Sequence, residues 1–430
     1  MSGIVSSDDP GHRYRRSAIA ATVKIALLSF EYPPETGFGG IGTYTWHHAR
    51  ALVRLGHDVH VLTGSPAPTP LRTTEEDGVM VHRFWSDGRL MRAFDSLRRF
   101  ELWWTSQRLQ NALSMQRGLA RLRRDHDFDI IEMPECGAEG ALITRRVDVP
   151  TVVRLHSPSR LIMPYYDVTE RDIALCSRIE MRALTSGAAL SACSQFVAAE
   201  VSGEVAGDRG VRVITNGMDM EWIDALGDPG DVHRDFGLDR RDLLVVFVGR
   251  LERRKGVHLL PDIAGALLER FNVTLAVAGD DLFGYGSGTL APSLAGRPLR
   301  GSIHLLGHLG LPEVRRLTWA ADVVLLPSLW ENCPYSYLEA MAAGRVVVGS
   351  HQGGIPELIT DGHNGRLAVT GDATSFVDRL ADVISDDEQR SRLGAAARGS
   401  IRLSHDAIDT ARLSVDFYED VIAGRTSRAS

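Results

Sequence analysis

The chain has 430 residues, 44% of them hydrophobic and 24% charged, a composition that excludes disordered, collagen-like and coiled-coil proteins. Its 48 Lys and Arg against 55 Asp and Glu give a net charge of −7, which is too acidic for a protein that coats nucleic acid. No apolar run reaches the 18 residues that a membrane-spanning helix needs. Four scattered cysteines without metal-ligand spacing predict a reducing compartment and no metal site.

The first 21 residues predict a polar, disordered tail, because they lack the apolar core and cleavage site of a signal peptide. We therefore expect a cytoplasmic protein. An open α/β domain is expected over residues 22–222, with a helix at 43–55 behind its first loop. Its buried parallel strands are predicted at 23–29, 57–62, 129–131, 150–155, 188–192 and 211–214.

A second α/β domain is expected over residues 223–404, after a polar linker that ends near residue 241. Its strands are predicted at 243–248, 273–278, 303–306, 322–326 and 345–349. A last helical pattern over 405–423 has no strand after it, so we expect this helix to cross back onto the first domain together with the chain end at 430. The fold class is thus α/β, with two doubly wound domains.

A long helical segment at 88–125 interrupts the α/β pattern. From residue 89 to residue 124 it holds nine arginines (89, 92, 98, 99, 108, 117, 121, 123 and 124) against Asp95 and Glu101, a local charge of +7. One interpretation is a helix whose arginines face water. The other is a docking surface for an anionic acceptor or for the inner face of a membrane.

The loop at 31–42 lies between the first strand and its helix, where backbone N–H groups and the helix dipole favour an anion. Its glycines, Gly39 and Gly40 among them, let the backbone approach a ligand closely. The spacing of dinucleotide-binding loops is not met, so a simple tight turn stays an alternative.

A second loop, Gly249 to Gly256, follows the first strand of the second domain. Arg250 and Lys255, five positions apart, can hold a diphosphate from two sides. A solvated basic turn is the alternative, but open α/β sheets bind ligands at the carboxyl ends of their strands, where this loop lies.

The most specific pattern runs from Glu331 through Asn332, Cys333 and Pro334 to Glu339, after the strand at 322–326. Pro334 suits a first helical turn, which leaves nearby backbone N–H groups free. The two carboxylates are suited to accept hydrogen bonds from sugar hydroxyls. An exposed helix carboxylate is the alternative for Glu339, although its neighbours are apolar.

These motifs, in this order, resemble the GT-B retaining glycosyltransferases of family 4. The resemblance covers about residues 23–405. It rests on Gly249-Arg250…Lys255-Gly256, Pro327-Ser328…Glu331…Glu339, Gly353-Gly354-Ile355-Pro356-Glu357 and Asp361-Gly362…Asn364-Gly365, with Gly39-Gly40, Arg154-Leu155-His156, Ser194 and Asn216-Gly217-Met218-Asp219 in support. Many relatives have Phe-Gly where this chain has Asn332-Cys333-Pro334, which leaves the identity of the sugar open.

The resemblance implies two Rossmann-like domains facing across a cleft, with donor sugar on the second and acceptor on the first. It assigns the diphosphate to Arg250 and Lys255, the ribose to Glu339, and the reacting centre to His156. Glu331 and the backbone after it would bind the transferred sugar. The implied donor-binding set is Gly39, Gly40, Asn216, Gly249, Arg250, Lys255, Glu331, Asn332, Cys333, Pro334, Tyr335 and Glu339.

The implied reaction is transfer of a hexose or N-acetylhexosamine, with retention, from a UDP- or GDP-linked donor to a hydroxyl group. The implied catalytic residues are His156, Arg250, Lys255 and Glu331, and no cofactor or metal ion is expected. The acceptor stays open among sugars, natural products and lipid-linked molecules. Two alternatives share the scaffold: a sugar-nucleotide epimerase or hydrolase, and a non-catalytic nucleotide-sugar-binding protein.

Overall fold

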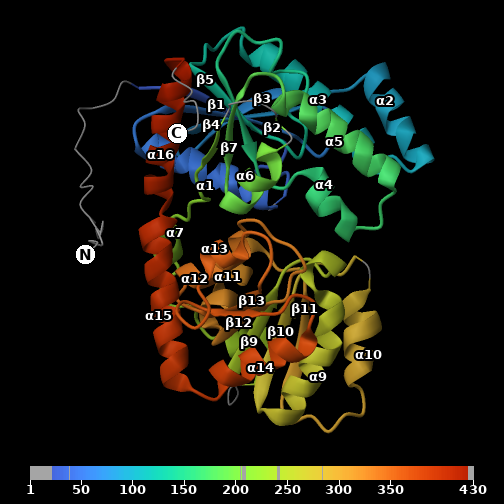
Figure 1. Ribbon diagram of the computed structural model, residues 1–430, viewed down its shortest axis with the longest axis vertical. Helices are drawn as coiled ribbons and strands as arrows, with labels where there is room; N and C mark the ends of the chain where they lie inside the picture. Colours follow the sequence, from blue (N-terminus) through green and yellow to red (C-terminus); the bar gives the residue numbers. More distant parts are fainter. Residues whose placement is uncertain are drawn as a thin grey trace, which may run out of the picture.

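The computed structural model describes residues 22–37, 39–203, 205, 210–239, 243–282 and 284–424. The tail predicted over residues 1–21 lies outside them. Two α/β units, each built on one open sheet, lie one above the other in Figure 1. The two doubly wound units that the sequence predicts are therefore confirmed.

The N-terminal sheet has eight strands in the order β3-β4-β2-β1-β5-β6-β7-β8. They are β1 (Lys24–Ser29), β2 (Asp58–Thr63), β3 (Thr69–Glu76), β4 (Val79–Trp85), β5 (Ile130–Pro134), β6 (Thr151–Leu155), β7 (Ala189–Ala192) and β8 (Val211–Val213). Strand β3 pairs antiparallel with β4, and the other neighbours are parallel. Strands β3 and β4 were not predicted, because β3 is polar and mostly exposed and so lacks the apolar run of a buried strand.

The C-terminal sheet has six strands in the order β11-β10-β9-β12-β13-β14, all pairs parallel. They are β9 (Leu243–Val248), β10 (Val273–Ala278), β11 (Ser302–Gly307), β12 (Val323–Leu326), β13 (Val346–Ser350) and β14 (Arg366–Ala368). The short strand β14 is the one that the sequence analysis missed. Parallel strands of this kind place all their carboxyl ends at one edge of the sheet, and in both sheets the candidate loops leave from that edge.

The helices follow the predicted order with shifted bounds. Helix α1 (Gly40–Arg54) begins three positions earlier than predicted, and the linker holds α7 (Met220–Asp224) and α8 (Val232–Phe236). The remaining helices are α4 (Ser159–Ile162), α5 (Glu170–Leu184), α6 (Gln195–Ser202), α9 (Leu260–Arg270), α10 (Ala291–Leu294), α11 (Leu311–Ala320), α12 (Tyr335–Ala342), α13 (Ile355–Leu358) and α14 (Ala373–Ile384). Short turns of other helix types are η2 (Met163–Tyr165), η3 (Arg253–Lys255), η4 (Val257–Leu259) and η5 (Gly286–Leu290).

The last two helices, α15 (Asp387–Ser404) and α16 (Ala407–Ile422), run along one side of both units (Figure 1). Helix α16 packs on α1, so the predicted crossing back to the first domain is confirmed. A buried carboxylate fixes it there: Glu132 accepts hydrogen bonds from Tyr418 of α16 at 2.7 Å and from Tyr44 of α1 at 2.8 Å. Because burying an unpaired carboxylate is costly, this pairing makes the docking of α16 specific.

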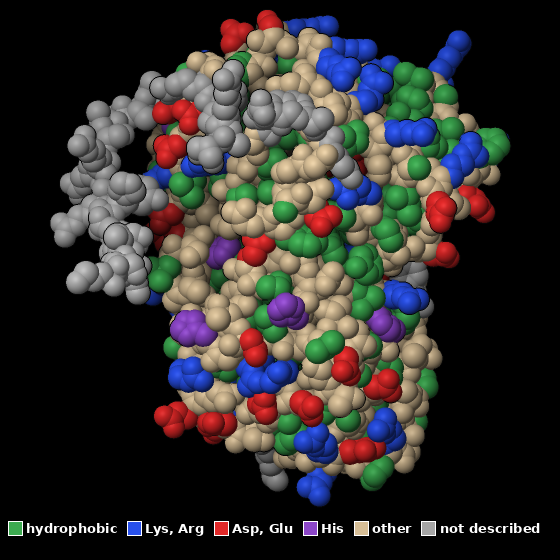
Figure 2. Space-filling model, viewed as in Figure 1, with side chains coloured by type: hydrophobic (Ala, Val, Ile, Leu, Met, Phe, Trp, Pro, Cys, Tyr) green, Lys and Arg blue, Asp and Glu red, His purple; other side chains and the backbone are tan. Residues whose placement is uncertain are grey.

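The basic segment is not one helix. It divides into α2 (Arg89–Asp95), a 3₁₀ turn η1 (Ser96–Phe100) and α3 (Trp103–Leu122), with Glu101 in a left-handed conformation between them. Lys and Arg side chains gather over this part of the upper unit in Figure 2. Arg108 departs from the expected solvated pattern, because it is buried and lies 3.6 Å from Glu180. Among the described residues, no helix is long and apolar enough to cross a bilayer.

Candidate active site

The carboxyl ends of strands from both sheets meet between the two units, and side chains from the loop before α12 join them. The Asn332 side chain donates to the backbone oxygen of His156 at 2.6 Å and accepts from the Ser194 hydroxyl. From the other side, the Asn216 amide donates to the Cys333 oxygen at 2.9 Å. These polar contacts hold the loop that carries Glu331 directly against the N-terminal unit.

Glu331 accepts from two cations at the centre of this junction. Its carboxylate lies 2.5 Å from Lys255 Nζ and 3.1 Å from Arg254, and Ser328 donates to it at 3.2 Å. Burial alone raises the pKa of Glu331, but the charges of Lys255 and Arg254 outweigh it and hold the pKa at about 2. The carboxylate is therefore ionised at any physiological pH. Sequence reasoning singled out Lys255 but missed Arg254, whose burial depends on packing against the other unit.

The loop after β9 presses closely on the end of β12. Gly256 has φ of 75°, and a Cβ there would collide with the backbone oxygen of Pro327. Gly249 also has a positive φ, 155°, which residues with a side chain rarely adopt. This packing brings Lys255 to Glu331 and leaves Arg250 exposed at the rim, 3.3 Å from Glu252.

Gly353 and Gly354 pack closely against the backbone of Glu331 and Asn332. A Cβ on either glycine would collide with the backbone oxygen of Glu331 or of Asn332, and Gly354 N–H donates to the Glu331 oxygen at 3.0 Å. In the same motif, Glu357 accepts from the first backbone N–H groups of α6 at 2.8 and 2.7 Å. A carboxylate at a helix N-terminus is stabilised by the helix dipole, so this motif also ties the two units together.

On α12, the two candidate donor-binding residues lie in different surroundings. Tyr335 is buried between the units, where its hydroxyl donates to the Gly217 oxygen at 3.0 Å and its ring stacks on His47. Glu339 is half-buried, and burial raises its pKa to about 7 while the charge of Arg315 opposes the rise. Glu339 is therefore near its titration point at neutral pH, whereas Tyr335 acts as an interface contact.

The loop before α1 contains an acid that sequence reasoning did not single out. Gly39 caps α1 with its backbone, and a Cβ there would collide with the Glu31 carboxylate. Burial raises the pKa of Glu31, opposed by the Gly42 backbone N–H group and by the charge of Arg250. Since Arg250 belongs to the other unit, Glu31 and the loop that carries Arg250 lie close enough for their charges to interact. Gly40 follows at the first position of the helix, with open space around it.

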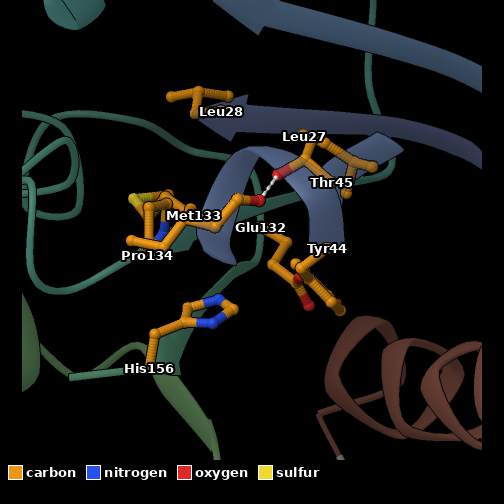
Figure 3. A pocket seen from close by; sticks show the side chains of 9 residues that line it. Leu27, Leu28, Tyr44, Thr45, Glu132, Met133, Pro134 and His156 are labelled. Carbon is orange, nitrogen blue, oxygen red and sulfur yellow. Dashed lines mark hydrogen bonds between the residues drawn. The ribbon is translucent and has the colours of Figure 1, made fainter. Parts of the chain in front are cut away.

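His156 follows β6 and is buried beside a cavity of about 10 Å³, where its ring meets that of Tyr44 edge-on at 5.0 Å (Figure 3). Its backbone N–H donates to the Glu135 carboxylate at 2.9 and 2.8 Å. Burial, with the charges of Arg154 and His48, lowers the pKa of His156 well below its usual value. The imidazole is therefore neutral at pH 7 and can donate or accept a hydrogen bond without being charged.

Three further acids are buried in the N-terminal unit, Glu135, Glu139 and Glu180, and Glu180 lies 3.6 Å from Arg108. Burial raises the pKa of Glu135 to about 8 and those of Glu139 and Glu180 to about 7. The position of Glu135, directly after β5, is a signal that could have identified it. Glu180 comes from a helix and is brought there by tertiary packing alone.

The comparisons with known proteins agree with this arrangement. Residues 39–217 match the family model "Glycosyl transferase 4-like domain", and residues 230–400 match "Glycosyl transferases group 1". α-Maltose-1-phosphate synthase of Mycobacterium tuberculosis is 28% identical over 413 residues, covering 93% of this chain and 100% of that protein.

Among solved structures, sucrose-phosphate synthase from Thermosynechococcus elongatus superposes with a TM-score of 0.74 at 19% identity, covering 94% of this chain and 100% of the other. HepE from Anabaena, in complex with UDP-glucose, superposes with a TM-score of 0.68 at 20% identity, covering 93% and 100%. These likenesses establish the fold as GT-B.

Two Rossmann-like units joined by polar contacts, with these family matches, define an enzyme that transfers glycosyl groups from nucleotide sugars. The chain belongs to the group 1 glycosyltransferases of family 4.

Proposed function

We propose that this enzyme transfers a hexose or N-acetylhexosamine, with retention, from a UDP- or GDP-linked donor to a hydroxyl of a sugar, natural-product or lipid-linked acceptor. The observation that carries the proposal is the ionised Glu331 held by Lys255 and Arg254 opposite the start of α1. A fixed carboxylate beside fixed cations suits a ligand that offers sugar hydroxyls next to a diphosphate. The complex of the similar HepE with UDP-glucose supports a UDP-linked donor.

In the proposed mechanism, Arg250 and Lys255 stabilise the negative charge that develops on the leaving diphosphate, and the backbone of Gly39 and Gly40 approaches it from α1. Such preorganised charge stabilisation contributes the largest single term in many enzymes. Glu31 occupies the same helix end. Burial raises the pKa of Glu31, and a phosphate bound at the same helix end would raise it further, because like charges repel.

The proton of the acceptor hydroxyl would pass to the leaving phosphate oxygen on the same face of the sugar, so no separate base is required. Glu331 would accept hydrogen bonds from hydroxyls of the transferred sugar. His156 would donate a hydrogen bond to the sugar from the acceptor side. Its buried position beside Tyr44 keeps the imidazole neutral.

A thermal-shift panel with UDP, GDP, ADP, dTDP and their hexose conjugates tests the donor assignment. A ligand at about 100 times its dissociation constant adds about 2.7 kcal/mol to stability, so the correct base should stand out clearly. Transfer with the selected donor should then give the retained anomer by NMR. Release of free or epimerised sugar without acceptor would favour the epimerase or hydrolase, and binding of no nucleotide would favour the binding protein.

We expect transfer to be independent of metal ions. Arg250, Lys255 and the N-terminus of α1 supply the positive charge that a divalent cation would otherwise contribute. Excess EDTA in an active assay should therefore leave the initial rate unchanged. A loss of activity that added Mg²⁺ or Mn²⁺ restores would contradict this mechanism.

We also propose that the enzyme is cytoplasmic and that its basic segment contacts an anionic membrane surface. Leu90, Phe100 and Trp103 are 44%, 65% and 57% exposed, and exposed aromatics beside cations are typical of interfacial binding. Arginines exposed on the same segment are Arg89, Arg92 and Arg99.

The wild-type enzyme should therefore sediment with anionic vesicles at low salt and not with neutral ones. An Arg92→Ala/Arg99→Ala variant should lose most of this binding. Arg108 is unsuitable for the test, because it is buried and its loss would disturb the fold. Absence of sedimentation at low salt would exclude the membrane contact and leave an anionic acceptor as the alternative ligand.

A further inference from the structure

Three histidines converge on the face of the N-terminal sheet that α3 covers. They are His60 on β2, His82 on β4, and His126 in the segment between α3 and β5. One ring nitrogen from each lies within 4.8 Å of the other two. His60 and His82 are buried and His126 is half-buried, so the cluster reaches the surface through His126 alone among the three. None of these three histidines belongs to the candidate active site described above.

Polar neighbours orient the two buried rings. The Nε2 of His60 lies 3.2 Å from the Asp58 carboxylate, and the Nδ1 of His82 lies 2.8 Å from the Thr73 hydroxyl. A carboxylate only accepts, so His60 must donate through Nε2 and present the lone pair of Nδ1. That Nδ1 is 2.8 Å from His82 Nε2.

Two nitrogen lone pairs at this distance repel each other unless a positive charge or a proton lies between them. In the proton case, Thr73 donates to His82, which donates to His60, which donates to Asp58. This chain satisfies the two buried rings but uses nothing of His126, whose ring packs 4.6 Å from that of His60. A cation accounts for all three imidazoles together.

We propose that His60, His82 and His126 form a binding site for a divalent transition metal ion of the Zn²⁺ class. Neutral imidazoles are the ligands that Zn²⁺, Co²⁺ and Ni²⁺ share. Tetrahedral Zn²⁺ at about 2.0–2.1 Å from each nitrogen needs nitrogens about 3.3 Å apart, which small side-chain rotations achieve from the present spacing. Asp58 and Thr73 would then act as the outer partners that orient metal-bound histidines.

The position of the site indicates a structural role. Asp58 and His60 lie at the first and third positions of β2, whereas the candidate site residues follow the carboxyl ends of the strands. A metal ion here would tie β2 and β4 to the chain leaving α3. The ligands are 22 and 44 residues apart in the sequence, a separation that no local metal motif has, so pairing of β2 with β4 is needed to bring them together.

Titration of the metal-free enzyme with Co²⁺ tests the site, because Co²⁺ bound by nitrogen ligands absorbs visible light. We expect one equivalent to bind with visible bands, Zn²⁺ to displace it, and either ion to raise the melting temperature. His126→Ala, at the half-buried ligand, should weaken binding at least tenfold. Asp58→Asn keeps all three ligands and should still weaken binding about tenfold or more by removing the outer partner.

The matched control is His363→Ala, at an exposed histidine of the C-terminal unit, which should bind Co²⁺ as the wild type does. Equal melting temperatures of the metal-free variants would show that each one folds. The proposal is overturned if the wild type binds no Co²⁺ with visible bands, or if both His126→Ala and Asp58→Asn bind it as tightly as the wild type. None of these readouts depends on glycosyl transfer.

Discussion

Replacing Lys255 with alanine is expected to lower turnover at least tenfold, and about 100-fold if its charge acts mainly on the leaving phosphate. Lys255 is the cation in closest contact with Glu331, at 2.5 Å, and it comes from the loop that carries Arg250. Its loss removes positive charge where the diphosphate would separate. The fold should survive, because Arg254 still neutralises Glu331 from 3.1 Å.

Arg253→Ala is the matched control for this prediction. Arg253 lies in the same 3₁₀ turn as Lys255 and carries the same charge, but its side chain is exposed to solvent. Steady-state kinetics with the donor that the thermal-shift panel selects should show a near-normal rate for Arg253→Ala. A Lys255→Ala enzyme with wild-type turnover on a demonstrated acceptor would contradict the assignment of the diphosphate site.

The parts of the fold that sequence predicts are those with a strong apolar signal. Strands such as β9 are buried on both faces and form unbroken apolar runs, so their pattern is unambiguous. Strand β4 was not predicted because it carries Arg83, a fully buried cation whose partners are Glu35 and Glu76. A charge in a core strand can be recognised only when its partners are known, and those lie on other elements.

The candidate site divides in the same way. Loops at strand ends predict where Arg250, Lys255 and Glu331 gather, because parallel strands share one edge. Sequence reasoning could not find Arg254 or Glu31, since their surroundings arise from two units meeting. Nor could it show that Asn332 and Tyr335 would use their side chains to join the units, a role that depends on partners more than 100 positions away.

Replacing Glu331 with glutamine is expected to be the most destabilising single change at the site. Glutamine keeps the shape of the side chain but removes the charge that neutralises Lys255 and Arg254, two largely buried cations. Leaving buried charges uncompensated costs about 3–5 kcal/mol. For a unit of this size, that corresponds to a fall of roughly 6–20 °C in the melting temperature. Turnover should fall as well, because the sugar loses an acceptor.

The comparison with Glu269→Gln separates burial from charge removal. Glu269 pairs with Arg297 at 2.8 Å in the same unit, but both side chains are about one-third exposed, and such pairs contribute about 1 kcal/mol or less.

The cost of Glu331→Gln should also depend on pH. Since the folded pKa of Glu331 is about 2 against an ordinary 4.5, its stabilisation is complete above pH 4.5 and is lost as the pH falls toward 2. The melting temperatures of Glu331→Gln and of the wild type should therefore converge as the pH falls through that range. Equal melting temperatures of the two proteins at pH 7 would show that Lys255 and Arg254 do not need this carboxylate.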